Sequence, residues 1–441
     1  MSDTTIHAGV FRTLLVAGLG FLFVLGGISA PLIAQRGGMF RGSSEDPAIA
    51  YSTAPLNNVV ADVNKQIQDG TRHLTFDGRS GYLQSALDAL EIPVDSQLLV
   101  FSPTSLQARQ INEGNPRALF FNDRVALGWV RGGVLEVAAQ DASEGVAFYT
   151  LEQRANTTAN PPQFKRAFQC LGCHLAGDTL GVAGLLMFST TRPSGPRASG
   201  LPAAIDQRTP LPERFGGWFV TGSAGSTPHM GNMVAALDGR PSRELTSVEG
   251  LFDADGYRAL SSDIAAHLVL SHQVGMFNLL TRASWEARAA DPTQHAPFLA
   301  APGEEALIAT MMSGIADEVV DYLLFIDEAR LTDRARGLSG FAERFSTVGP
   351  KDRKGRSLHE LDLNGRLMKY PCSYLIYSPT FDALPPAAKD PIYRRLWEVL
   401  SGEEQGERYR SALSLADRQA ILEILRDTKK DLPQSFQGVA R

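Results

Sequence analysis

Two of the three cysteines in this chain lie three positions apart, and a histidine follows the second one directly. The stretch RAFQCLGCHLAGDTLGVAGLLMF places Cys170, Cys173 and His174 at positions i, i+3 and i+4. On a helix, side chains at these spacings project from one face. Two thiols and an imidazole on one face can hold a single prosthetic group, because the thiols can form covalent bonds while the imidazole binds a metal.

The pattern C-x-x-C-H is the signature of covalent attachment of a c-type haem. A redox-active CxxC would need a βαβ setting, and a zinc site would need a second Cys/His pair at ligand spacing. The sequence has neither feature. It therefore predicts one covalent haem c, with Cys170 and Cys173 as thioether links and His174 as the proximal ligand of the iron.

A six-coordinate haem iron needs a second axial ligand, which is usually Met or His. The Gly- and Ser-rich stretch GGWFVTGSAGSTPHMGNM, residues 216–233, contains a His-Met-Gly-Asn turn that could reach over a haem face. We favour His229 of this turn as the second metal ligand. The other candidates are Met230 and Met233 of the same turn, Met187 beyond the motif, and His272 on a predicted buried helix.

Other residues capable of chemistry have simpler interpretations. Cys372 lies in the aromatic and apolar stretch KYPCSYLIYS, which is typical of a buried, unreactive thiol. We expect His73, His295 and His359 to be solvated. The basic stretch GPKDRKGRS, residues 349–357, could dock an acidic redox partner, but a solvated loop is the favoured interpretation.

The N-terminus predicts that most of the chain leaves the cytoplasm. Leu14–Ala34 is an uncharged run of about the length that spans a bilayer. It is either a retained anchor or a cleaved signal peptide, and we favour the anchor because the candidate cleavage sites, after Ala30 and Ala34, are poor. Covalent haem attachment takes place outside the cytoplasmic membrane, so both features place the protein on the periplasmic side or, if the segment is cleaved, in the periplasm.

The composition is that of a globular protein of several domains. The chain has 441 residues, of which 44% are hydrophobic and 20% charged, and its net charge of -6 gives no support for binding nucleic acid. We expect five parts, at residues 1–34 (membrane segment or signal peptide), 35–48 (linker), 49–155 (strand-rich domain), 156–340 (haem c-binding region) and 341–441 (helical C-terminal region).

The expected fold class is α+β, with a small antiparallel sheet domain followed by mostly helical regions. Short apolar runs separated by turn residues predict strands at 97–101, 117–123, 125–130, 134–139 and 146–151. Apolar periodicity predicts helices from about 160 through the CLGCH motif, at 262–289, 304–329, 390–400 and 415–427. Ser414 is the expected N-cap of the last helix.

Three longer stretches resemble a family of large, exported mono-haem bacterial proteins that are similar to cytochromes c. These stretches are LPERFGGWFVTGSAGSTPHMGNM, SDIAAHLVLSHQVGMFNLLTRA and LDLNGRLMKYPCSYLIYSPTFDALP, the last followed by YRRLWEVLSG. The similarity runs from about Gln97 to Pro433. It implies a haem c at Cys170, Cys173 and His174, and it strengthens the case for His229. Relatives often have a histidine where this chain reads TGSAG, and its absence weakens any catalytic role taken over from the family.

The function that these features predict is a one-electron carrier in or beside a membrane redox chain, with redox proteins as partners. Electron transfer needs only a haem edge near the surface and a suitable reduction potential. One alternative is a haem enzyme with an open iron position, such as a peroxidase-like protein. The other is a haem-bearing structural subunit of a respiratory or photosynthetic complex.

Overall fold

The computed structural model describes residues 38–155, 161–190, 202–234, 244–291 and 304–438. The described residues belong to one compact unit. The apolar segment Leu14–Ala34 lies outside the described residues. Within the described ranges, no helix is both long and apolar enough to cross a membrane.

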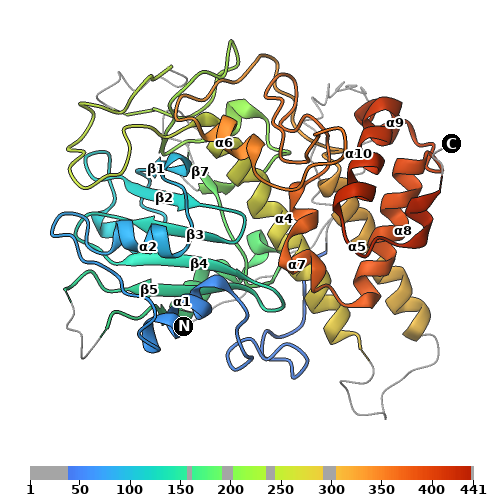
Figure 1. Cartoon of the computed structure of the whole chain (residues 1–441), viewed down its shortest axis with the longest axis horizontal. Coiled ribbons are helices and arrows are strands. Elements are labelled where there is room, and N and C mark those ends of the chain that lie inside the picture. Colours follow the sequence, from blue (N-terminus) through green and yellow to red (C-terminus); the bar gives the residue numbers. More distant parts are fainter. Residues whose placement is uncertain (1–37, 156–160, 191–201, 235–243, 292–303, 439–441) are drawn as a thin grey trace, which may run out of the picture. The chain divides into compact units, whose positions relative to one another are not determined.

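A seven-stranded antiparallel sheet confirms the α+β class (Figure 1). Its strand order is β6-β5-β4-β3-β2-β1-β9, and a separate pair joins β7 to β8. All five predicted strands are present. The strands are β1 (Leu98–Val100), β2 (Arg117–Phe121), β3 (Val125–Trp129), β4 (Leu135–Asp141), β5 (Gly145–Leu151), β6 (Lys165–Arg166), β7 (Phe188–Thr190), β8 (Pro202–Ala204) and β9 (Trp218–Phe219).

One face of the sheet packs against two helices that the sequence analysis did not predict, α1 (Val59–Gln68) and α2 (Leu83–Ala89). Alternate residues of the strands, among them Leu127, Val137 and Tyr149, join these helices in one apolar core. The side-chain alternation of a strand sends the intervening residues to the opposite face.

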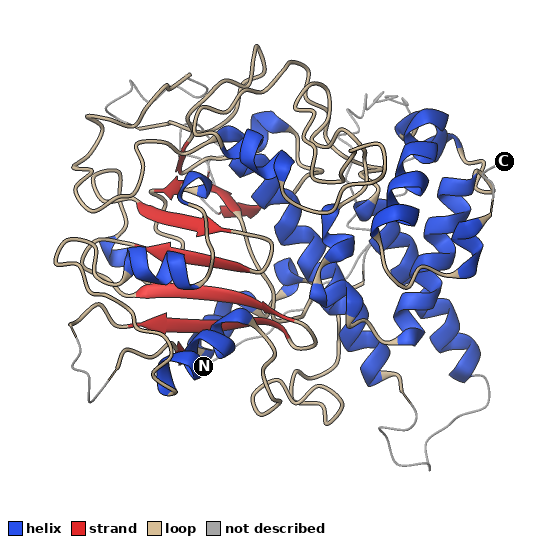
Figure 2. Ribbon diagram, viewed as in Figure 1, coloured by secondary structure: helices blue, strands red, loops and turns tan. Residues whose placement is uncertain are grey.

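The opposite face packs against the long helix α4 (Ile264–Ala289), which lies between the sheet and the C-terminal helices (Figure 1). The helix is buried nearly all round, as its sequence predicts. The remaining helices are α3 (Leu171–His174), α5 (Glu304–Leu323), α6 (Phe341–Thr347), α7 (Pro379–Asp382), α8 (Pro386–Ser401), α9 (Glu407–Ala412) and α10 (Leu415–Thr428). Figure 2 shows the C-terminal helices beside the sheet. Ser414 is the N-cap of α10, as predicted, and it forms a capping box with Asp417.

The sequence ranges 49–155, 156–340 and 341–441 share one apolar core. Leu98 of β1, Ile264 of α4 and Ile421 of α10 belong to the same cluster of buried residues. The described part of the predicted linker, residues 38–48, also packs on this unit: Phe40 is buried against Trp285 of α4, with ring centroids 5.4 Å apart. The domain boundaries at 155 and 340 stay predictions.

The long helix expected to begin near residue 160 does not form, and this prediction was wrong. The chain instead makes the two-residue strand β6, a turn of 3-10 helix at Phe168–Cys170, and the single turn α3. Pairing with β5 explains the difference, since Lys165 and Arg166 lie opposite Thr150 and Tyr149. Tertiary contacts have overridden the helical apolar spacing.

The start of α4 holds two distant parts of the chain together. The Asp263 carboxylate caps the helix by accepting a hydrogen bond from the Ala265 N–H at 2.8 Å. It also accepts bonds from the N–H of Leu338, at 2.7 Å, and from the N–H and hydroxyl of Ser339, at 2.8 and 2.9 Å. Asp263 is fully buried, so water cannot take over these hydrogen bonds if the carboxylate is removed.

We expect Asp263→Ala to lower the free energy of unfolding by about 3–5 kcal/mol, because the change removes an N-cap and leaves several buried donors unpaired. Urea unfolding followed by circular dichroism measures this change. Ser414→Ala is the matched control: it removes the exposed cap of α10 and should cost about 1 kcal/mol. Equal, small effects of the two variants would contradict the role given to Asp263.

Candidate functional site

The CLGCH motif occupies one helical turn on the side of the sheet where β5 and β6 lie. Cys170 has right-handed helical backbone angles, φ -64° and ψ -27°, and leads directly into α3. The spacing argument for Cys170, Cys173 and His174 therefore applies to this turn, although the long helix is absent. Cys173 is exposed, whereas Cys170 is half-buried against the apolar cluster of Val146 and Phe148.

The His174 imidazole is held in one tautomer. Its Nδ1 lies 2.9 Å from the carbonyl oxygen of Gly184. A carbonyl can only accept, so Nδ1 carries the ring proton and Nε2 keeps its lone pair. Burial lowers the pKa of His174 below its usual value of 6.5, while the Gly184 bond partly opposes this shift. The ring is therefore neutral at pH 7, with Nε2 available as a ligand.

Helix α4 positions the carbonyl that orients His174. The Asn278 side chain accepts a hydrogen bond from the Leu185 N–H at 2.8 Å and donates one to the Leu185 carbonyl at 2.9 Å. Gly184 packs so closely on this amide that an added Cβ would lie 2.3 Å from Asn278 Oδ1. A residue of the buried helix thus fixes the loop that faces the histidine.

The thiols of the motif are free. Neither Cys170 nor Cys173 forms a disulfide. Burial, followed by the negative charge of Glu136, raises the pKa of Cys170 to about 11. The third thiol, Cys372, is fully buried, and burial raises its pKa strongly. The expected location of Cys372 in the core is confirmed.

His229 is buried on a turn whose Asn232 is hydrogen-bonded to Trp218 of β9 and to Val220, at the opposite edge of the sheet from β6. Among the described residues, the structure shows no hydrogen bond or ring contact between His229 and His174. The N–H of Gly231 donates to His229 Nδ1 at 3.0 Å. This bond makes Nδ1 the acceptor and puts the ring proton on Nε2. To bind a metal through Nε2, His229 would have to move that proton to Nδ1 and give up the bond from Gly231.

The other candidates for a second ligand differ in how they are held. His272 uses both ring nitrogens: Nε2 lies 2.7 Å from the Ser373 hydroxyl, and Nδ1 is hydrogen-bonded to Gln207. Met187 is 2% exposed and belongs to the main core. These contacts give His272 and Met187 structural roles, while Met230 and Met233 are half-buried on the turn of His229.

Two charged residues beside the motif were missed by the sequence analysis. Arg117 begins β2 and Glu136 lies on β4, and their side chains form an ion pair of 2.5 Å across β3. Both charges act on Cys170 and on His174. The only sequence signal is the glycine of VALGWV, Gly128, which leaves room between them. An added Cβ at Gly128 would lie 2.4 Å from Arg117 Nη2.

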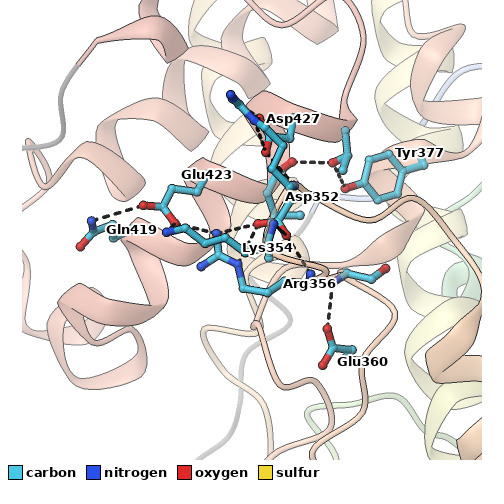
Figure 3. A network of polar contacts seen from close by, with 12 residues as sticks. Asp352, Lys354, Arg356, Glu360, Tyr377, Gln419, Glu423 and Asp427 are labelled. Carbon is cyan, nitrogen blue, oxygen red and sulfur yellow. Dashed lines mark hydrogen bonds and ion pairs between the residues drawn. The ribbon is translucent and has the colours of Figure 1, made fainter.

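The basic stretch 349–357 pairs with acidic side chains of the same protein (Figure 3). Arg353 binds Asp427 at 2.6 Å, Lys354 binds Glu423 at 2.8 Å, and Arg356 binds both Glu423 and Asp352 at 2.6 Å. These pairs neutralise the stretch locally. It therefore gives no support for docking an acidic partner there.

Comparisons with models of protein families, with curated proteins and with solved structures found no match. In the described part of the chain, no three or more His, Cys, Asp or Glu residues are grouped so that they could hold a metal ion. The chemistry of the site must therefore be argued from the CLGCH turn and its neighbours.

Four histidines are kept neutral by burial. Burial lowers the pKa of His229, His267 and His359 to about 4 and that of His272 to about 3. The expectation that His359 is solvated was wrong, because it packs beside Phe345 and Tyr374. Of the other two histidines expected to be solvated, His73 is exposed and His295 lies outside the described residues.

These pKa values predict a loss of stability in mild acid. In the unfolded chain the four histidines take up protons below about pH 6.5, whereas in the folded protein they stay neutral until about pH 4. The free energy of unfolding should therefore fall as the pH drops from about 6.5 to 4.5, by on the order of 1–3 kcal/mol for each histidine. Glu328 opposes this trend in part, because burial raises its pKa to about 7.

Urea unfolding at several pH values measures the slope. His272→Gln should reduce it, because one buried imidazole no longer titrates, whereas His73→Gln at the exposed position should leave it unchanged. The carboxylates of Glu423 and Asp427 have pKa values near 2, held there by Lys354 and by Arg353, so they act only at lower pH. A flat profile between about pH 6.5 and 4.5 would contradict the prediction.

Proposed function

We propose that this protein is an exported c-type cytochrome that carries single electrons through one haem bound to Cys170, Cys173 and His174. The observation that carries the proposal is the tautomer of His174, whose Nδ1–H is donated to the Gly184 carbonyl beside two free thiols. A histidine that binds a metal through Nε2 needs such a partner for its other nitrogen. A haem bound there supplies the reversible one-electron chemistry of Fe(III) and Fe(II).

The surface around the motif suits electron exchange with a protein partner. Cys173 is exposed, and so are two large apolar side chains: Phe168, two residues before Cys170, at 44%, and Met39 at 46%. Met39 lies against Gly181, which follows the motif closely. An exposed apolar rim favours brief contact with a redox protein more than the internally paired stretch 349–357 does.

The proposed location is the periplasmic side of the cytoplasmic membrane. Leu14–Ala34 supports it as an uncharged run with the length of a membrane span. A retained anchor would hold the electron carrier beside membrane-bound donors and acceptors, and a cleaved segment would release it into the periplasm. The proposed partners are redox proteins in either case.

The covalent link can be tested by replacing the cysteines one at a time. We expect Cys170→Ser and Cys173→Ser each to leave one thioether and to move the α-band of the reduced haem to longer wavelength. The double variant should lose all haem that resists extraction with acidified acetone. Cys372→Ala is the control, because its thiol lies in the core and should leave covalent haem unchanged. A wild-type protein that carries no haem after export would contradict the proposal. Haem that resists extraction from the double variant would contradict it as well.

We propose His229 as the second residue that would hold the iron, through Nε2 after its ring proton moves to Nδ1. We expect His229→Ala to convert the iron from low-spin to high-spin, as seen in the optical spectrum of the oxidised protein. His272→Gln serves as the control, because the two hydrogen bonds of His272 give it a structural role. A low-spin spectrum that survives His229→Ala would exclude His229 and leave Met230 and Met233 of the same turn.

A further inference from the structure

The ion pair of Arg117 and Glu136 is an unusual feature of the sheet face that bears Phe148. The two side chains are only 19% and 11% exposed. Removing two charges from water costs several kcal/mol for each ion unless hydrogen bonds complete the pair. Such a pair contributes little to stability by itself, so its presence beside the CLGCH turn calls for another explanation.

The hydrogen bonding of this pair is incomplete. Arg117 Nε and both carboxylate oxygens of Glu136 are buried and have no hydrogen-bond partner of good geometry among the described residues. The pair between Arg353 and Asp427 is different, because its guanidinium makes three such bonds to one carboxylate. The charges of Arg117 and Glu136 are therefore poorly neutralised by their surroundings, and their field acts on neighbouring groups.

The backbone holds the pair in one place. Glu136 lies opposite Gly128 in the pairing of β4 with β3, and Leu119 lies opposite Gly128 on the other side. The guanidinium of Arg117 crosses above this glycine, where any side chain would collide with it. Adjacent strands fix both charges relative to each other and to Phe148 of β5, whose ring lies 4.7 Å from that of His174.

We propose that Arg117 and Glu136 set the reduction potential of the haem bound at the CLGCH turn. This inference rests on the proposed function. Oxidised iron carries one more positive charge than reduced iron, so a nearby cation favours Fe(II) and a nearby anion favours Fe(III). Arg117 and Glu136 are positioning residues, because they act on the iron through their field and not by touching it.

The test is the midpoint potential of purified holoprotein at pH 7. We expect Arg117→Gln to lower the equilibrium constant for reduction by about tenfold, which is about 59 mV for one electron, and Glu136→Gln to raise it by a similar factor. The double variant should lie closer to the wild type than either single variant, because two opposite charges are removed together. Arg117→Lys keeps the charge and should stay close to the wild-type value.

Arg356→Gln is the matched control. Arg356 is 18% exposed and forms an ion pair with the buried Asp352 in the C-terminal network of Figure 3. Replacing it therefore breaks a comparable ion pair but removes no charge beside the motif. We expect its potential to be unchanged.

Two failures are distinguishable. A wild-type protein without covalent haem would overturn the proposed function itself. Covalent haem with a wild-type potential in both Arg117→Gln and Glu136→Gln would overturn only the present inference, as would shifts of the same sign. If Arg117→Gln does not fold, Glu136→Gln decides alone, because an unchanged or lowered potential in that variant contradicts the proposal.

Discussion

The packing of α4 against one face of the sheet is the interaction on which the rest of the structure depends. Its first turn, through Asp263, holds the segment before α6, and its middle, through Asn278, holds Leu185 and hence the loop that orients His174. Near its end, Trp285 receives Phe40 from the N-terminal segment. One buried helix thus connects the N-terminal segment, the CLGCH turn and the C-terminal helices.

This arrangement explains how a single helical turn can hold chemistry in a fixed geometry. A helix of four residues has almost no stability of its own, because the conformational entropy lost in forming the first turn outweighs the hydrogen bonds that the turn makes. The turn at Leu171–His174 is instead held by its neighbours: β6 pairs with β5 before it, and Gly184 returns to bond both the backbone and the ring of His174 after it. The geometry of the motif therefore comes from tertiary structure.

Much of the fold could be predicted from local patterns, and the reason is visible in particular elements. The strand runs alternate or cluster apolar residues between turn signals, and α10 begins at its predicted cap, Ser414. The helix expected near residue 160 failed because strand pairing and the Asn64 side chain, which bonds both the N–H and the carbonyl of Phe164, outweigh a correct apolar spacing. No local pattern contains information about such distant partners.

The same limit applies to the site. The chemistry of Cys170, Cys173 and His174 can be read from the sequence, because it depends on residue type and spacing. Arg117 and Glu136 come together only through the register of three strands. The proposed covalent links would hold a haem without a deep pocket, so the large chain around the motif would not be needed to retain it. The rest of the chain instead orients the histidine and sets the electrostatic field around it. Helix α4 fixes the tautomer of the imidazole, and the rigid sheet fixes two charges beside it. In a low-dielectric interior, such fixed charges have larger effects than mobile charges at a solvated surface.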